Sequence, residues 1–344
     1  MTLLANLVRG IAIAAGLSLA AAAQPPSSAA VARAKQSFID EMVKEHDFDR
    51  AELTALLDGA VIEAAVLEAM ARPAERVVPW FEYRTIFITE ERIAAGVVFW
   101  NEHAATLEAV SERYGVAPEM IVAIIGIETY FGTRMGRYRV LDALATLAFA
   151  YPPRASFFSS ELESFLLLAR EEQVDATTAL GSYAGAMGAG QFIPSSYRAY
   201  AVDADADGKR DLWTNWDDVF GSVANYFDKH GWRAGEPVME SALRPPGFEG
   251  PEPRNALELG GTVASLTRMG YVFTTSLPSD APAEAFSYEA ASGGSEYWVG
   301  YHNFRVVTRY NRSTKYALAA HQLAQAVRGR YVAALASNVG SAAE

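Results

Sequence analysis

Glu128 is the residue of this sequence that is best placed to move a proton. It ends a helix-forming run that begins at Pro118, and helical spacing places it on one stripe with Ile121, Ile124 and Ile125. A carboxyl group on an apolar stripe is costly to ionise, so its pKa rises and it keeps its proton near neutral pH. A general acid needs that protonated state.

A buried carboxylate can also be a purely structural residue. In this alternative, Glu128 lies in the core and is paired with an arginine such as Arg134 or Arg137. The helix by itself does not decide between the two interpretations, so the choice depends on motifs elsewhere in the chain.

A glycine-rich segment spans residues 180–196, with four glycines within residues 181–190. Such a density brings the backbone close to another group, and Ser182 and Gln191 would supply polar contacts to a ligand. The order of residues is not that of a phosphate loop. Gly181 directly precedes Ser182, so the G-x-S-x-G pattern of serine hydrolases is also absent. A tight crossing of two helices remains the alternative.

The acidic segment 203–218 resembles an EF-hand loop, with carboxylates at the first, third, fifth and ninth positions and glycine at the sixth. The predicted ligands are Asp203, Asp205, Asp207, the carbonyl of Lys209, and Asp211. Thr214 stands where a bidentate glutamate is expected, so Asp217 or Asp218 would close the site. Oxygen ligands of this kind suit a structural Ca²⁺ ion, and an acidic turn without an ion is the alternative.

The elements that would position these residues are mostly helices. Helices are expected at 31–45, 50–70, 89–114, 117–128, 141–149, 159–172, 217–230 and 313–335. Runs rich in valine and aromatic residues at 296–301 and 304–310 predict two short strands joined by a turn. The predicted fold class is mainly α (α+β), with a small β element at about 295–310.

The N-terminus has the pattern of a secretory signal: one positive residue, Arg9, then an apolar stretch, then small residues up to Ala23. We expect cleavage after Ala23, a disordered leader over 24–30, a catalytic domain over 31–335 and a flexible tail over 336–344. No cysteine is present, so we expect a soluble periplasmic protein without disulfides or a cysteine-linked lipid anchor. The 41 acidic and 29 basic residues, without a basic cluster, argue against a nucleic-acid partner.

Taken together, the motifs resemble one family. They lie at residues 126–132, 141–151, 181–196, 221–226 and 310–319. The chain resembles the soluble and membrane-bound B-type lytic transglycosylases of bacterial peptidoglycan metabolism. The resemblance implies a lysozyme-like, mostly helical fold with a small β element, and it implies that the acidic segment is the family's cation-binding loop. It implies no cofactor for catalysis.

The resemblance also implies roles for individual residues. Glu128 would be the sole catalytic acid/base, and Ser182 and Gln191 would contact the muramyl N-acetyl region and neighbouring sugars. The remaining residues implied to hold or line the glycan are Tyr83, Tyr151, Arg154, Tyr310 and Asn311. Two positions depart from the family pattern: Phe157 stands where a tyrosine is expected, and Pro153 where a second arginine is common.

The implied reaction cleaves the β-1,4 bond between N-acetylmuramic acid and N-acetylglucosamine and closes a 1,6-anhydro ring without consuming water. It explains why the motifs offer one convincing acid and no second carboxylate, since Asp142 is expected to cap or brace a helix. Peptidoglycan glycan strands would be the substrate, and cell-wall synthesis enzymes are further candidate partners. Two alternatives remain: a lysozyme-type muramidase with the same Glu128, and a non-catalytic peptidoglycan-binding protein.

Overall fold

The computed structural model describes residues 26–71 and 78–341, with side chains as far as Ser337. These residues form two compact units that interleave along the chain. Unit 1 comprises the described residues of 26–71 together with 132–219, and unit 2 comprises 78–131 and 220–341. The expected signal at 1–23 lies outside the described residues. The prediction of one domain over 31–335 does not separate the two units.

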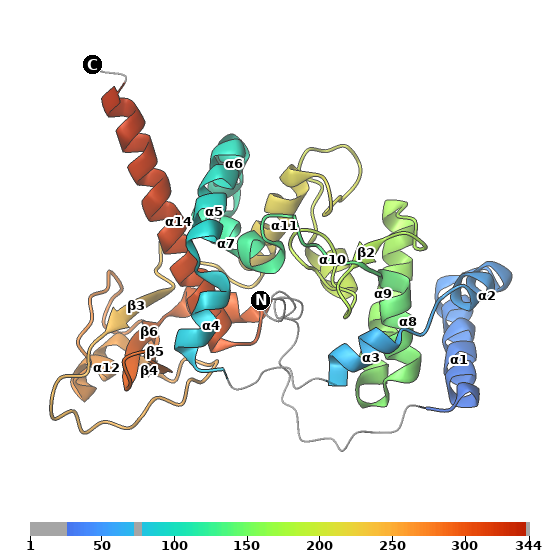
Figure 1. Cartoon of the computed structure of the whole chain (residues 1–344), viewed down its shortest axis with the longest axis horizontal. Coiled ribbons are helices and arrows are strands. Elements are labelled where there is room, and N and C mark those ends of the chain that lie inside the picture. The colour runs from blue at the N-terminus through green and yellow to red at the C-terminus, as the bar shows by residue number, and fades with distance from the viewer. Residues whose placement is uncertain (1–25, 72–77, 342–344) are drawn as a thin grey trace. The chain divides into compact units, whose positions relative to one another are not determined.

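Unit 1 is built around a buried helix, α8. Its elements are α1 Ser28–His46, α2 Arg50–Asp58, α3 Ala64–Ala71, β1 Tyr138–Arg139, α8 Val140–Ala150, the 3-10 helix Pro152–Arg154, α9 Ala155–Glu172, β2 Leu180–Gly181 and α10 Pro194–Tyr200. Every residue of α8 is buried, and α9 packs along it (Figure 1). Strands β1 and β2 pair antiparallel, which brings the start of the glycine-rich segment beside the entrance to α8.

Asp142, in the first turn of α8, braces the unit as expected. Its carboxylate forms an ion pair with Arg139 at 2.6 Å and accepts a hydrogen bond from the backbone N–H of Val61 at 2.9 Å. Since both oxygens are engaged and the residue is only 4% exposed, Asp142 is a structural carboxylate.

Unit 2 contains the longest helix and the larger sheet. Its elements are α4 Trp80–Phe87, α5 Glu90–Glu102, α6 Ala104–Tyr114, α7 Pro118–Thr129, most of α11 Trp216–Lys229, β3 Met239–Ala242, β4 Gly261–Thr262, α12 Val263–Met269, β5 Pro282–Glu289, β6 Ser295–Gly300, α13 His302–Tyr310 and α14 Thr314–Ser341. Helix α7 packs against α14 and α5. The strands form an antiparallel sheet in the order β3-β6-β5-β4, with α12 beside it (Figure 1).

The expected strand at 304–310 is wrong, because this segment is helix α13. Phe304 and Val307 are both buried and three residues apart, as on one helix face, and Val306 and Val307 are buried in succession, which a half-buried strand does not allow. The strand that pairs with β6 is β5, at 282–289. The expected strand at 296–301 corresponds to β6, and the sheet extends beyond 295–310 to β3, β4 and β5. The mainly helical class with a small β element is confirmed.

Several helix boundaries also differ from the expectation, and each difference has a local cause. The expected helix over 89–114 breaks at His103, whose ring packs 4.7 Å from the ring of Phe99. The one expected over 50–70 breaks after Asp58, because the N–H groups of Val61 and Glu63 bond to side chains of α8.

Both ends of the predicted catalytic domain extend further as helix. Helix α1 begins at Ser28, where the Ser27 hydroxyl accepts a hydrogen bond from Ala30 N–H, so the last three residues of the expected leader are helical. At the other end, α14 continues to Ser341 through a run of good helix formers, 333–336, so most of the expected tail 336–344 is helical as well.

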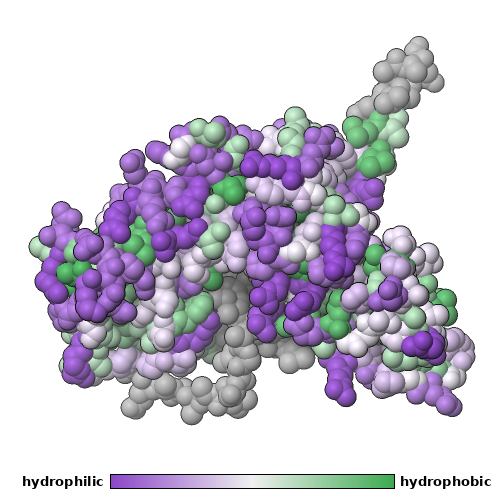
Figure 2. All heavy atoms as spheres, turned by 180° about the vertical axis from the view of Figure 1, so that it is seen from behind, coloured by the Kyte–Doolittle hydropathy of each residue, from purple (hydrophilic) through white to green (hydrophobic). Residues whose placement is uncertain are grey.

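The visible surface is mostly polar. On the face shown in Figure 2, hydrophilic residues predominate and apolar ones form small, separate patches. The described end of α14 is an exception, since Val332 and Leu335 are 53% and 44% exposed. Among the described residues, no helix has both the length and the apolar character needed to cross a membrane.

Candidate active site and acidic loop

Glu128 lies near the end of α7, a helix that is buried on all sides from Met120 to Ile127. Pro118 occupies the first turn, where its missing N–H costs no hydrogen bond. Gly126 is required because a β-carbon there would lie 2.8 Å from the ring of Phe131, which folds back onto the helix. After the helix, Tyr130 and Phe131 both adopt left-handed backbone angles, φ 51° and 58°. The turn therefore ends the helix sharply just after the carboxyl group.

The hydrogen-bond partner of Glu128 is a tyrosine of the same unit. The hydroxyl of Tyr316, in the first turn of α14, donates to Glu128 Oε1 at 2.6 Å. Burial raises the pKa of Glu128 from its usual 4.5 to about 8, and the Tyr316 hydrogen bond only partly opposes this. A carboxyl with this pKa is protonated at neutral pH.

Of the other predicted residues of unit 2, Tyr310 lies near this carboxyl. The pKa values of Tyr310 and Tyr316 are raised, mainly by burial and secondly by the charge of Glu128. Tyr83, on α4 and 6% exposed, also contributes to the pKa of Tyr316. Asn311, which follows α13, is 8% exposed. Sequence reasoning missed the role of Tyr316, although it belongs to the quoted motif 310–319.

The glycine-rich segment forms a tight turn within unit 1. The Ser182 hydroxyl oxygen accepts hydrogen bonds from the N–H groups of Ala184 and Ala186, at 3.2 and 3.0 Å. Gln191 has φ 53° and donates through its side-chain amide nitrogen to the carbonyls of Met135 and Gly188, at 3.1 and 3.0 Å. These bonds leave the Ser182 hydroxyl hydrogen and the Gln191 Oε1 atom as the groups for a ligand. The glycines hold a turn and not a helix crossing.

Tyr151 precedes the 3-10 helix that follows α8, and Arg154 is its last residue. The Arg154 guanidinium lies 4.2 Å from the ring centroid of Phe157 and 5.1 Å from that of Phe158. Phe157, which departs from the family pattern, therefore retains an aromatic face for the arginine. Burial raises the pKa of Tyr183, and the nearby Tyr151 adds to this, so the two tyrosines lie close to each other.

Three carboxylates of the acidic loop converge. Asp203, Asp205 and Asp218 each place one oxygen within 4.8 Å of the others. Asp218, at the start of α11, is buried, and burial followed by the like charges of Asp205 and Asp203 raises its pKa. An oxygen cluster of this size fits the 2.3 to 2.6 Å ligand distances of Ca²⁺. The residues present therefore suit such an ion.

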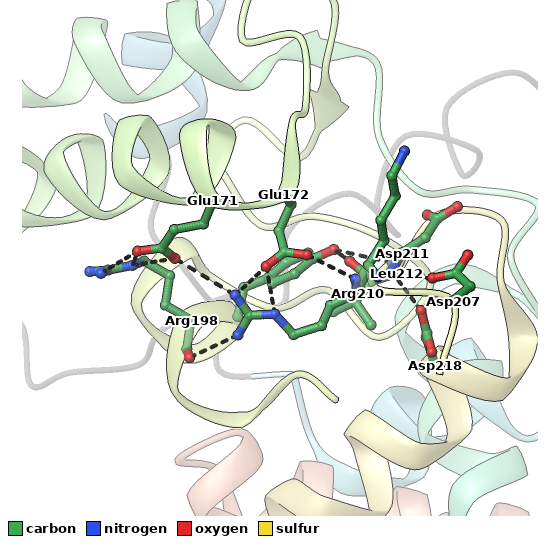
Figure 3. Close-up of polar contacts among 10 residues, drawn as sticks. Glu171, Glu172, Arg198, Asp207, Arg210, Asp211, Leu212 and Asp218 are labelled. Atoms are coloured by element: carbon green, nitrogen blue, oxygen red, sulfur yellow. Dashed lines mark hydrogen bonds and ion pairs between the residues drawn. The ribbon is translucent and has the colours of Figure 1, made fainter. Parts of the chain in front are cut away.

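The carboxylates of Asp207, Asp211 and Asp217 are not part of this cluster. Asp211 accepts hydrogen bonds from Trp213 and Thr214, and Asp207 accepts one from Lys209 N–H. Of the two candidates for closing the site, Asp217 and Asp218, the cluster contains Asp218. The carboxylate of Asp218 turns to the loop (Figure 3) and accepts hydrogen bonds from the N–H groups of Ala204 and Asp211, both at 2.7 Å.

The comparisons with known proteins agree with the motifs. The transglycosylase SLT domain matches residues 30–325, most of the chain. The chain belongs to the transglycosylase SLT family. The resemblance predicted from the motifs is thereby confirmed.

Several members of this family are similar over most of their length. The membrane-bound lytic murein transglycosylase B of Escherichia coli is 45% identical over 301 residues, which are 85% of this chain and 82% of the relative. The catenated lytic transglycosylase SltB1 of Pseudomonas aeruginosa has a TM-score of 0.82 and 46% identity, with 89% of this chain and 99% of that chain covered. The lytic transglycosylase Slt35 of E. coli, solved in complex with calcium, has a TM-score of 0.79 and 44% identity, covering 87% and 94%.

Proposed function

We propose that the protein is a lytic transglycosylase of peptidoglycan in which Glu128 alone serves as acid and base. The observation that carries this proposal is the pKa of Glu128, which burial raises to about 8. Its family supports the reaction class, since the relatives are named lytic transglycosylases. An acid with this pKa is in the state required for the first proton transfer at neutral pH.

In the first step, protonated Glu128 donates its proton to the glycosidic oxygen between N-acetylmuramic acid and N-acetylglucosamine, and the bond to the muramyl C1 breaks. The muramyl acetamido group stabilises the electron-poor centre from the opposite face. The Glu128 carboxylate then takes the proton of the C6 hydroxyl, whose oxygen bonds to C1 and closes the 1,6-anhydro ring. Glu128 regains its proton, and no water is consumed.

Tyr316 has a defined part in this scheme. Its hydroxyl donates to Oε1 at 2.6 Å, so Oε2 is the oxygen that carries the transferable proton. When Glu128 becomes ionised between the two steps, the same hydrogen bond gains charge and becomes stronger. Tyr316 thus positions the carboxyl and stabilises its short-lived anionic form.

Glycan contacts are proposed for residues of each unit. In unit 2, Tyr310 lies close enough to Glu128 to feel its charge, Tyr83 likewise interacts with Tyr316, and we assign glycan contacts to Tyr83, Tyr310 and Asn311. In unit 1, the Ser182 hydroxyl donates to a sugar or acetamido oxygen, and Gln191 Oε1 accepts from a sugar hydroxyl or N–H. Tyr151 and Arg154, also in unit 1, would offer an aromatic face and a cation to the glycan.

The acidic loop is proposed to bind Ca²⁺ through Asp203, Asp205 and Asp218. The ion would neutralise three like charges and fix the start of α11, so its role is structural. The calcium complex of Slt35 supports this assignment. We further propose that the protein is exported to the periplasm, where its substrate lies, with cell-wall synthesis enzymes as candidate partners.

The test is to digest purified murein sacculi and identify the products by mass spectrometry. A lytic transglycosylase releases 1,6-anhydromuramyl products, which are lighter by one water than the reducing products of a muramidase. Reducing products alone would show a lysozyme-type hydrolase. Absence of any product from a protein that still binds sacculi would show a binding protein.

A further inference from the structure

The end of the acidic loop contacts the glycine-rich turn through residues 212 and 213, all within unit 1. Leu212 is 1% exposed, and its carbonyl accepts a hydrogen bond from Ala189 N–H at 2.8 Å. At Gly188, with φ 69°, a β-carbon would lie 2.4 Å from the same carbonyl oxygen, so the two backbones touch. The Trp213 indole N–H donates to the carbonyl of Leu180 at 3.0 Å. The loop thus holds both ends of the turn that carries Ser182.

Gln191 is connected to the same contact. Its backbone N–H and its side-chain amide both donate to the carbonyl of Gly188, at 3.2 and 3.0 Å. A displacement of Leu212 would therefore move Gly188 and, with it, the Gln191 side chain.

The same contacts also reach the carboxylate cluster of Asp203, Asp205 and Asp218. Asp218, one of its three members, accepts a hydrogen bond from Asp211 N–H, next to Leu212. Tyr197, on α10 and fully buried, bonds on both sides of Asp211: its hydroxyl donates to the carbonyl of Arg210 and accepts from Leu212 N–H at 3.3 Å. Segment 210–212 is therefore connected to the cluster and to the glycine-rich turn at once.

The segment is also held firmly from the side. Figure 3 shows the Arg210 guanidinium directed at Glu172, at the end of α9; the Arg210 backbone N–H bonds the other oxygen of Glu172 at 2.8 Å. A segment held by this many contacts cannot deform locally. A displacement of Asp218 would therefore displace Leu212 as well.

We propose that Tyr197, Leu212 and Trp213 couple cation binding at the acidic loop to glycan binding at the glycine-rich turn, so that each ligand strengthens the binding of the other. The proposal rests on the proposed function, which assigns Ca²⁺ to the loop and glycan to the turn. Without an ion, the three like charges repel and Asp218 moves away from Asp203 and Asp205. The turn then loses the position in which Ser182 and Gln191 meet the glycan. Such coupling is reciprocal.

The experiment measures calcium affinity by calorimetry in the full chain carrying Glu128→Gln, which leaves the glycan uncut. Calcium chloride is titrated with and without a saturating murein tetrasaccharide. We expect the dissociation constant for calcium to fall about fivefold or more when the glycan is bound, and the glycan constant to fall by the same factor when calcium is bound.

A second variant locates the coupling. Tyr197→Phe, added to Glu128→Gln, removes the hydroxyl that bonds Arg210 and Leu212, so both ligands still bind but the coupling factor approaches one. The matched control is Tyr288→Phe, which removes an equally buried hydroxyl from β5, bonded to the carbonyl of Thr314, and should leave the factor unchanged.

The outcomes separate the two proposals. If both ligands bind but neither changes the affinity of the other, the coupling is wrong and the proposed function stands. If the glycan does not bind at all, the proposed function fails and the coupling with it. If calcium alone does not bind, the calcium assignment and the coupling fail, whereas the proposed reaction of Glu128 stands. Should Tyr197→Phe not fold, hydrogen exchange decides in its place: calcium must slow exchange of the Ala189 amide in the Glu128→Gln protein, and an unchanged rate overturns the coupling.

Discussion

The two units of this protein use carboxylates in opposite ways. In unit 2, Glu128 stands alone among buried aromatic and aliphatic side chains, and its environment favours the neutral acid. In unit 1, three aspartates converge, and two of them, Asp203 and Asp205, lie on the outer part of a loop rich in backbone N–H donors. Burial of one carboxyl prepares it to hold a proton, whereas clustering of several prepares them to hold a metal ion.

A third carboxylate shows that burial alone does not make a catalytic acid. Glu161, on α9, is 3% exposed, and burial raises its pKa as well. Its two oxygens accept hydrogen bonds from the Ser195 backbone N–H and hydroxyl, at 2.9 and 2.7 Å. Both oxygens are therefore occupied by the protein. Glu128, with one bonded oxygen, keeps the other for a substrate.

The largest expected effect comes from removing the isolated acid. Glu128→Gln should lower kcat by about two to four orders of magnitude, because general acid/base catalysis contributes that much, while glycan binding is preserved. Muropeptide release and glycan affinity should be measured on the same protein. The control is Glu161→Gln, which should reduce thermal stability and leave kcat within about tenfold. A Glu128→Gln enzyme with most of its activity would refute the assignment.

The next effect is the dependence of activity on pH. Because burial raises the pKa of Glu128, the active protonated form is present below about pH 8 and is lost as the pH rises through that value. Above it, kcat/KM should fall about tenfold per pH unit. Rates on a soluble glycan across pH 5 to 10 would show this limb. If kcat/KM instead rises with pH through neutrality, the active form of Glu128 is the ionised carboxylate, and Glu128 does not begin the reaction as an acid.

A smaller effect is expected from Tyr316→Phe. The change removes one hydrogen bond to a carboxylate that is transiently charged, worth about 1.5 kcal/mol, so kcat should fall about tenfold. Since this bond lowers the pKa of Glu128, its loss should also move the alkaline limb of the pH profile upward. A downward shift of the limb would contradict the hydrogen-bond geometry.

The smallest effect concerns the carboxylates of the loop. Chelating calcium should lower the melting temperature by several degrees, because an ion present at about 100 times its dissociation constant adds about 2.7 kcal/mol of stability. Asp218→Asn should lose most of this dependence on calcium, and Asp217→Asn should keep it, because only Asp218 belongs to the cluster. If both variants respond equally, the cluster is not the cation site.

The sequence predicts the chemistry of these regions better than their architecture. Glu128 and the acidic loop were found because a charged residue on an apolar stripe and alternating aspartates are local patterns. The helix at 302–310 was misassigned because a run of aromatic and valine residues fits a strand or a helix until its neighbours are known.

Other features depend on tertiary contacts that no local pattern contains. The place of Asp218 in the cluster depends on its contacts with the loop, since its carboxylate accepts hydrogen bonds from the N–H groups of Ala204 and Asp211. The hydrogen bond from Tyr316 joins residues that are 188 positions apart in the chain. The division into two interleaved units likewise follows from contacts between segments that are far apart in the sequence.

The central claim is that Glu128 holds a proton at neutral pH. The most direct measurement is an NMR titration of the full chain with labelled glutamate side chains, in which the Glu128 signal is identified by its absence from Glu128→Gln. The account predicts a transition near pH 8. A Glu128 signal that titrates below about pH 5, near the ordinary value for glutamate, would contradict it.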